Sequence, residues 1–278
     1  MQLNLKNTSL KLDRPLVMGI LNVTPDSFSD GGLFVSAGNL QQQIESMLQA
    51  GVDIIDVGGE STRPGSQPVA LDEELQRVIP AIQLIRELGD IPISIDTTKP
   101  EVMRAAVAAG ADMINDVNAL RTTGAMQAVT ELGVPVCLMH MLGQPKNMQQ
   151  QPEYENVVQQ VLSFFAERVE ACVNAGVARE KILIDPGFGF GKTVQHNFQL
   201  LKKLELLHSL GQPLLVGMSR KSMLGAVTVK AVDQRLAGSL AAAVIAAMQG
   251  VHIIRVHDVA ETVDALKVVQ ATQMGEEQ

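Results

Sequence analysis

Residues 181–185 read Lys-Ile-Leu-Ile-Asp, a short run of branched apolar side chains that stops at a carboxylate. A parallel strand buried on both faces requires such a run. The pattern recurs seven more times, as VMGIL before Asn22, DIIDVG before Glu60, IPISI before Asp96, DMI before Asn115, VPVCLM before His140, PLLVGM before Ser219 and HIIRV before His257. Eight such runs predict a closed (β/α)8 barrel whose polar strand ends meet at one mouth.

Helix-like segments separate these runs, as such a barrel requires. We expect helices over residues 37–50, 71–88, 100–109, 122–132, 154–175, 196–210, 235–249 and 259–273. Linkers and low-complexity segments are not evident before the polar tail 274–278, which we expect to fray. Residues 1–278 therefore predict one α/β domain of a size usual for this barrel.

Composition limits the functional class and the compartment. The formal net charge of −8 argues against a nucleic-acid surface, which needs a concentrated basic patch. The chain has no apolar stretch near the length of a membrane span, and its N-terminus lacks the apolar core of a secretion signal. Cys137 and Cys172 fit buried thiols in a reducing compartment. We expect a soluble cytoplasmic protein without nucleic-acid or membrane partners.

The segments after the first two strands, 22–32 and 58–65, are dense in Gly, Pro, Ser and Asp. These residue types can simply make turns. Both segments, however, are longer than most strand-to-helix connections, and long loops in compact domains often bind ligands. We interpret them as active-site loops.

Residues 185–193, DPGFGFGKT, resemble a phosphate-binding loop only superficially. Pro186 stands where that motif needs its first glycine, and the spacing of the glycines does not fit a dinucleotide fingerprint. We interpret the segment as a glycine-rich turn that lets the backbone and Phe188 or Phe190 approach a ligand.

Three cations follow the last two strands. Lys221 comes after the seventh, and Arg255 and His257 stand two residues apart at the end of the eighth, so that both point to one face. Barrels of this type often bind phosphate there. A salt bridge beside Asp258 is the alternative for Arg255, but the position favours an anion site.

Asp96, Asn115 and Asp185 close three different strands. Each alone could cap a helix or a turn. Together they suit a flat heterocycle: a carboxylate accepts two parallel N–H bonds from a 2-amino-4-oxo-pyrimidine, Asn donates and accepts, and Lys221 donates to the ring carbonyl.

Covalent catalysis and zinc binding are poorly supported. Cys137 and His140 have a CxxH spacing, but no second pair completes a zinc site, and a core role is the expectation for His140. No Ser or Cys has an evident base partner.

Seven blocks carry a resemblance that covers nearly the whole chain. They are MGILNVTPDSFSDGG (18–32), DIIDVGGESTRPG (53–65), ISIDTTKPEV (93–102), MIND (113–116), LIDPGFGFGK (183–192), LLVGMSRKS (214–222) and IIRVHDV (253–259). Through them the chain closely resembles bacterial dihydropteroate synthases.

The resemblance implies a transferase of folate biosynthesis. Such enzymes condense para-aminobenzoate with (7,8-dihydropterin-6-yl)methyl diphosphate, releasing pyrophosphate and forming dihydropteroate. The implied route is SN1-like, in which diphosphate leaves first and the arylamine attacks a pterin cation.

The resemblance also implies roles for individual residues. The pterin would be held or lined by Asp96, Asn115, Met139, Asp185, Phe190, Gly217 and Lys221. The diphosphate would be held by Asn22, Arg255 and His257, with Asn22 also reaching Mg²⁺; these three and Lys221 are the implied catalytic residues. Para-aminobenzoate would be framed by Phe28, Thr62, Arg63, Pro64, Phe190, Ser219 and Lys221.

A homodimer formed through barrel helices and competition by sulfonamides are implied as well. Phe28 and Pro64 are present in their common form, so ordinary sulfonamide sensitivity is expected.

Two alternatives remain at this stage. A methyltransferase-like pterin-binding barrel would share the Asp/Asn/Asp set, but it needs neither Arg255-x-His257 nor the loop that follows Asn22. A catalytically inactive pterin-binding paralogue would bind the pterin diphosphate without releasing pyrophosphate.

Overall fold

Eight parallel strands form the barrel in the computed structural model, which describes residues 1–6, 8–23, 32–61, 65–143 and 152–275. The strands are β3 (Leu16–Asn22), β4 (Ile54–Gly58), β5 (Ile93–Asp96), β6 (Met113–Asp116), β7 (Val136–Met139), β8 (Ile182–Asp185), β9 (Leu215–Gly217) and β10 (Ile253–Val256). They pair in the order β8-β7-β6-β5-β4-β3-β10-β9, and a parallel bridge between Ile184 and Leu214 joins the two ends. The predicted (β/α)8 barrel is confirmed.

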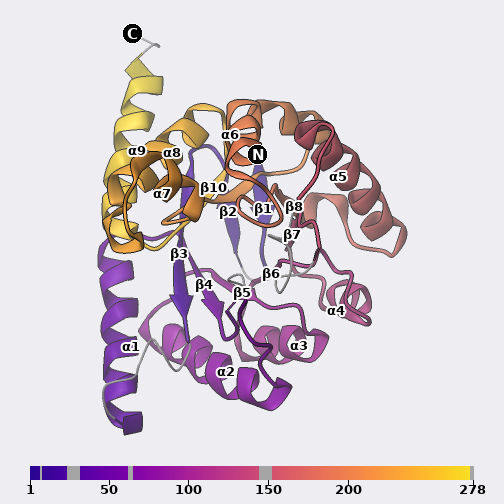
Figure 1. Ribbon diagram of the computed structural model, residues 1–278. Helices are drawn as coiled ribbons and strands as arrows, with labels where there is room; N and C mark the ends of the chain where they lie inside the picture. Colours follow the sequence, from indigo (N-terminus) through magenta and orange to yellow (C-terminus); the bar gives the residue numbers. More distant parts are fainter. Residues whose placement is uncertain (7, 24–31, 62–64, 144–151, 276–278) are drawn as a thin grey trace.

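Helices surround the strands (Figure 1). They are α1 (Gly32–Gln49), α2 (Leu71–Leu88), α3 (Pro100–Ala109), α4 (Ala125–Leu132), α5 (Val157–Asn174), α6 (Val194–Lys202), α7 (Ser222–Thr228), α8 (Leu236–Met248) and α9 (Val259–Met274). Two differences from expectation stand out. The predicted helix 196–210 ends at Lys202 and continues as a 3₁₀ segment, Leu204–Leu210, and α7 was not predicted. Among the described helices, none has the length and apolar character needed to cross a membrane.

Local sequence explains where several helices begin and end. Thr193 caps α6 by accepting the His196 N–H at 3.1 Å, and the His196 ring accepts the Thr193 N–H in return. Asn156 caps α5 by accepting the Gln159 N–H at 3.2 Å. These bonds satisfy N–H groups that the first turn of a helix leaves without partners. The first turns of α5 and α6, the helices on either side of β8, are therefore stabilised by side chains at their own N-termini.

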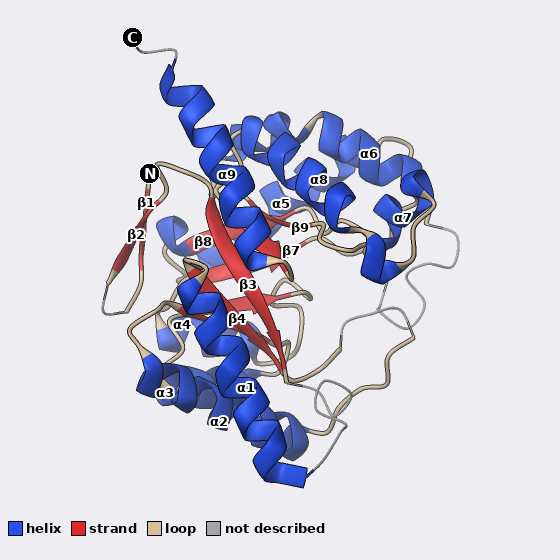
Figure 2. Cartoon of the chain, turned by 90° about the vertical axis from the view of Figure 1, so that its left-hand side faces the viewer, coloured by secondary structure: helices blue, strands red, loops and turns tan. Residues whose placement is uncertain are grey.

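An N-terminal hairpin, β1 (Gln2–Asn4) and β2 (Ser9–Lys11), lies on the opposite side of the barrel from α7 (Figure 2). Its leucines Leu3, Leu5 and Leu12 pack in one cluster with strand residues that include Met18 and Ile54. The hairpin closes the end of the barrel at which the strands begin. It was not predicted, because each strand has only three residues.

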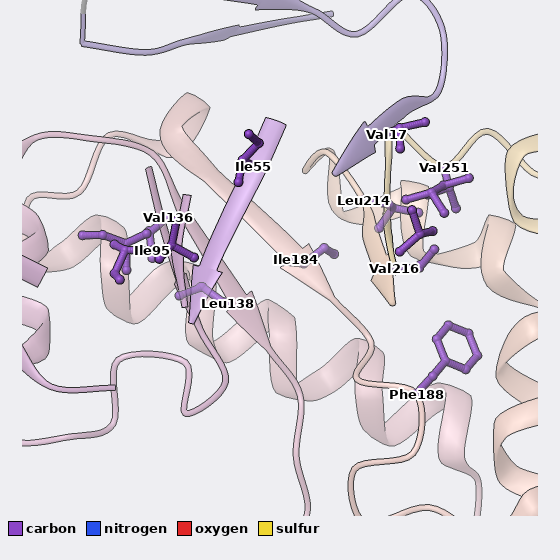
Figure 3. Packing of buried hydrophobic residues seen from close by; sticks show 14 of the residues in the cluster. Val17, Ile55, Ile95, Val136, Leu138, Ile184, Phe188, Leu214, Val216 and Val251 are labelled. Atoms are coloured by element: carbon purple, nitrogen blue, oxygen red, sulfur yellow. The ribbon is translucent and has the colours of Figure 1, made fainter. Parts of the chain in front are cut away.

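Strand alternation decides which side chains face the barrel interior. Outward residues such as Ile55, Ile95, Leu138 and Ile184 pack in the cluster that the helices cover (Figure 3). The alternate residues point inward and form successive layers. The lowest layer is apolar and contains Met18, Ile54, Met113, Cys137, Leu183, Leu215 and Ile253. By the same alternation, the next layer toward the mouth contains Asp56, Asp96, Asn115, Met139, Asp185, Gly217 and Arg255.

Candidate active site

Asp96, Asn115 and Asp185 all lie near the carboxyl ends of their strands, as predicted, and their side chains point into the barrel. Asp96 is paired in register with Asn115 on the neighbouring strand, and Asp185 is paired with Met139. Each of the three polar side chains is nearly buried, with exposures of 8%, 4% and 6%. The barrel interior therefore brings two carboxylates and an amide into one wall of the mouth.

Arg255 links two of the buried carboxylates. Its Nη2 donates to Asp96 Oδ2 at 2.8 Å, and its Nε donates to Asp56 Oδ2 at 2.6 Å. Asn115 Nδ2 donates to the same Asp56 oxygen at 3.2 Å. Arg255 thus sits in a salt-bridged network with Asp56 and Asp96, and its predicted alternative partner, Asp258, pairs with Arg220 instead.

Asp56 is a site residue that the sequence reasoning missed. It lies inside strand β4, is fully buried, and its second oxygen, Oδ1, has no partner among the described residues. A carboxylate in the middle of a buried apolar run was the available signal. Such a group needs a cation or donors close by, because a buried unpaired charge is very costly.

Burial dominates the electrostatics of this cluster. It raises the pKa of Asp96 to about 7; Arg255 opposes the shift, and neighbouring carboxylates add to it. Burial works against the charge of Arg255, but Asp56 and Asp96 raise the pKa of that guanidinium overall. The arginine therefore stays charged, while Asp96 is poised to change its protonation state near neutral pH.

Lys221, just before α7, contacts the turn that follows β8. Its Nζ donates to the Phe188 carbonyl oxygen and lies 4.5 Å from the centroid of the Phe190 ring. Burial lowers the pKa of Lys221 to about 8, against the attraction of Asp185. Phe190 in turn packs against the buried cluster of Val117, Met139 and Met141. Lys221, Phe190 and Met139, three residues expected at the pterin site, thus lie close together.

The glycine-rich turn is built around the Asp185 carboxylate. Asp185 Oδ1 accepts the Gly187 N–H at 2.8 Å, and burial raises the pKa of this carboxyl although Lys221 lowers it. Gly187, Gly189 and Gly191 all have positive φ angles, a conformation that favours glycine. Phe188 is fully buried in the core, whereas Phe190 lies beside Lys221. The approach of this turn to a ligand stays a prediction.

Ser219 and His257 come together from the loops after β9 and β10. Ser219 Oγ lies 3.0 Å from His257 Nδ1 and accepts the His257 backbone N–H at 3.2 Å. This contact was not evident from the sequence, and the expectation that the reaction uses no activated serine stays a prediction. The two residues are 38 positions apart, and only the adjacency of the two strands places them side by side.

Asn22 and Gly217 lie at the ends of their strands, as expected. Asn22 is paired in register with Gly58, and Gly217 with Arg255. Asn22 Oδ1 lies 3.6 Å from the position that a Cβ on Gly58 would take, so the amide borders the mouth beside β4. The predicted residues Phe28, Thr62, Arg63 and Pro64 lie outside the described residues.

A second missed network lies at the base of the loop that follows β4. Lys99 Nζ bridges Glu60 in this loop and the buried Glu74 of α2, and Thr97 Oγ1 donates to Glu74 Oε1 at 2.6 Å. Arg77 donates to the Gly59 carbonyl oxygen at 2.6 Å. These contacts anchor the root of a predicted active-site loop to α2 and to the loop after β5.

His140 has the core position that was expected. It is 6% exposed, and its ring meets Phe164 edge-on at 4.9 Å. Burial lowers its pKa to about 2, so the imidazole is neutral. The described residues contain no cluster of three or more His, Cys, Asp or Glu side chains that could hold a metal.

The comparisons with known proteins agree with this geometry. Residues 18–257 match the family model described as "Pterin binding enzyme". The chain is 54% identical to dihydropteroate synthase of Escherichia coli K12 over 277 residues, which is 100% of this chain and 98% of the relative.

Two solved structures extend the likeness. Yersinia pestis dihydropteroate synthase in complex with a sulfonamide drug is 51% identical with a TM-score of 0.93, covering 99% of this chain and 100% of that one. Xanthomonas albilineans dihydropteroate synthase in complex with 7,8-dihydropteroate is 48% identical with a TM-score of 0.89, covering 98% and 99%. This chain belongs to the dihydropteroate synthase family of pterin-binding enzymes.

Proposed function

We propose that this protein condenses para-aminobenzoate with (7,8-dihydropterin-6-yl)methyl diphosphate, forming dihydropteroate and pyrophosphate. One observation carries the proposal: Asp96, Asn115, Asp185 and Lys221 lie buried at the mouth of the barrel. The comparison supports it, because the dihydropteroate synthase of Escherichia coli K12 matches this chain over nearly its whole length. A flat pterin has the donor and acceptor edges that these groups match.

The pterin would be recognised chiefly by Asp185 and Lys221. Asp185 Oδ1 accepts the Gly187 N–H, which fixes the carboxylate. Each carboxylate oxygen can accept more than one hydrogen bond, so both oxygens can still accept the amino and ring N–H groups. Lys221 would donate to the ring carbonyl. Asp96 already uses Oδ2 for Arg255, so its Oδ1 is the oxygen that would face the ligand. Phe190 and Met139 would supply the apolar surface against the ring.

The diphosphate would lie between Asn22, Arg255 and His257. Arg255 uses Nε and Nη2 for the carboxylates, and its remaining nitrogen, Nη1, can donate to a phosphate oxygen. Asn22 Oδ1 is a hard oxygen ligand of the kind Mg²⁺ accepts beside phosphates and water, and Asn22 would hold that ion. When bound, Mg²⁺ would neutralise charge on the leaving diphosphate.

The reaction would not require a protein nucleophile. The bond between the pterin methylene carbon and the diphosphate oxygen breaks, and its electron pair leaves with the diphosphate. Positive charge spreads over the pterin, where the Asp96 and Asp185 carboxylates stabilise it. The arylamine nitrogen then bonds to the methylene carbon and releases a proton to solvent.

Para-aminobenzoate would bind where Phe190, Ser219 and Lys221 approach the two long loops. The residues proposed from those loops are Phe28, Thr62, Arg63 and Pro64. We propose that sulfonamides compete at this site and that the enzyme has ordinary sensitivity to them. Inhibition by sulfamethoxazole that is relieved by added para-aminobenzoate supports this site, and a purified enzyme indifferent to the drug contradicts it.

A homodimer is proposed from the surface of α7 and α8. Six large apolar side chains are exposed there, and contiguous apolar surface is typical of an interface. They are Val227, Val229, Val232, Leu236, Ile245 and Met248. Light scattering is expected to give a dimer for the natural chain and a monomer for Val229→Glu combined with Ile245→Glu. A monomer in both contradicts the interface.

We also propose a cytoplasmic location, supported by two buried free thiols, Cys137 and Cys172. Immunodetection in fractionated cells tests it. Recovery in an extracytoplasmic fraction contradicts it.

The proposed reaction is tested by pyrophosphate release from purified protein supplied with the pterin diphosphate and Mg²⁺. Release that depends on para-aminobenzoate, with dihydropteroate as product, supports the synthase. Tight pterin binding without release would favour the inactive paralogue.

A further inference from the structure

Lys192 has an unusual environment for a lysine. It lies near the end of the glycine-rich turn, is 2% exposed, and is surrounded by hydrogen-bond acceptors. Its Nζ lies 2.9 Å from His140 Nδ1, 2.9 Å from the Gly187 carbonyl oxygen, 3.1 Å from that of Phe190 and 3.3 Å from that of His140. Burying an ammonium group is costly unless its donors are satisfied. Here the acceptors come from two separate loops.

The two loops that meet at Lys192 are packed backbone against backbone. A Cβ on Gly187 would lie 2.0 Å from the His140 carbonyl oxygen, and one on Gly191 would lie 2.4 Å from that of Leu142. Glycine is needed at both positions for this approach. Lys192 lies at the junction and bonds to both sides, so it ties the loop after β7 to the turn after β8.

The turn is held from its other side by residues of the proposed site. Lys221 donates to the Phe188 carbonyl oxygen, while Lys192 donates to the carbonyl oxygens of Gly187 and Phe190. Asp185 accepts the Gly187 N–H. The two lysines therefore bind three carbonyl oxygens of one turn between them.

We propose that Lys192 is a positioning residue for the pterin pocket: it holds the backbone at Gly187, whose N–H fixes the Asp185 carboxylate, without touching substrate. The inference rests on the proposed function of the pocket. It predicts that loss of the ammonium group weakens recognition of the pterin ring specifically. Binding of para-aminobenzoate to the pterin-loaded enzyme should change little.

Lys181 provides a matched control. It directly precedes β8, at the end of the strand away from the mouth. Its Nζ also donates to a glycine carbonyl oxygen, that of Gly133, but at an exposed position. Lys192→Met and Lys181→Met remove the same group from a lysine that binds backbone carbonyls. Only Lys192 donates to the turn whose Gly187 N–H binds Asp185.

The experiment compares three proteins by calorimetry with 6-hydroxymethyl-7,8-dihydropterin, which lacks the diphosphate, and by steady-state kinetics. Lys192→Met is expected to raise the pterin Kd and the KM for the pterin diphosphate at least about tenfold. The KM for para-aminobenzoate at saturating pterin should stay within about twofold, as should every constant of Lys181→Met. A purely structural lysine would lower Tm without this split between the two KM values.

His140→Phe is the second variant, in case Lys192→Met does not fold. It keeps a ring against Phe164 and removes both imidazole nitrogens, including the Nδ1 that lies 2.9 Å from Lys192 Nζ, so the pterin Kd should rise about threefold. A folded Lys192→Met with unchanged pterin Kd, or with equal increases in both KM values, overturns the inference. Should Lys192→Met not fold, an unchanged pterin Kd in His140→Phe does the same. If the natural protein fails to bind the pterin alcohol, the proposed function falls first and this inference with it.

Discussion

Arg255 Nε donates to Asp56 Oδ2 at 2.6 Å, joining the last strand of the barrel to its second strand across 199 positions of sequence. Asp56 is fully buried, and the arginine side chain is 20% exposed. The same guanidinium reaches Asp96. Arg255, the cation proposed to bind the diphosphate, is thus positioned by two carboxylates, Asp56 and Asp96. Both carboxylates belong to the inward-facing layer next to the mouth.

Asp56→Asn tests whether this link matters for catalysis. The amide keeps the shape but removes the charge that orients Arg255, and small displacements of a catalytic group are costly. We expect kcat to fall about 30-fold, with pterin binding affected less. Glu131→Gln is the control, since it weakens an exposed ion pair with Arg104 away from the mouth. Steady-state kinetics of both variants measure the effect; an Asp56→Asn enzyme with natural kcat contradicts it.

Asp185→Asn tests the carboxylate fork for the pterin. An amide cannot accept two parallel N–H bonds, and hydrogen bonds to a charged acceptor are worth more than neutral ones. Turnover and pterin affinity should fall together, with the Kd from calorimetry rising about 100-fold. Pterin affinity that stays unchanged while turnover falls would remove the recognition role of Asp185.

The pH dependence of pterin binding should be bell-shaped. Asp96 must be ionised to accept N–H groups, and burial raises its pKa to about 7, so affinity is lost as pH falls through that value. Lys221 must be protonated to donate, and burial lowers its pKa to about 8 against the pull of Asp185, so affinity is also lost as pH rises through that value. Calorimetry at pH values from below the pKa of Asp96 to above that of Lys221 measures both limbs.

Two variants assign the limbs. Asp96→Asn should lose the acid limb, and Lys221→Arg should lose the alkaline limb because arginine stays charged. If the acid limb persists in Asp96→Asn, or the alkaline limb in Lys221→Arg, a different group is responsible for that limb.

Leu3→Ala tests the hairpin that closes the far end of the barrel. Leu3 is fully buried among leucines and strand side chains, and removing a buried leucine costs about 2–5 kcal/mol. The free energy of unfolding should fall by that amount while kcat at low temperature stays near natural. Val268→Ala, at a 67% exposed position on α9, should change stability by less than about 0.5 kcal/mol. Denaturant titration compares them, and equal losses would contradict a structural role for the hairpin.

Much of the site follows from strand alternation alone. Asp96, Asn115 and Asp185 each end an apolar run, and Arg255 stands one residue before the end of another. All four point inward, so their convergence could be predicted once eight strands were recognised. Asp56 was missed because it lies inside a run that reads as strand core.

Long-range contacts explain the other omissions. The partner of Ser219 stands on a neighbouring strand, and the acceptors of Lys192 come from two loops. Nothing local in the sequence marks either contact. The N-terminal hairpin was missed for a different reason, since its strands are too short to carry a period-two signal.

The central claim is that this mouth joins an arylamine to a pterin with loss of diphosphate. The most direct measurement is pyrophosphate release from purified protein given (7,8-dihydropterin-6-yl)methyl diphosphate and Mg²⁺, with and without para-aminobenzoate. The account predicts release that depends on the arylamine and equals the dihydropteroate formed. Release of pyrophosphate without dihydropteroate, or no release despite tight pterin binding, would contradict it.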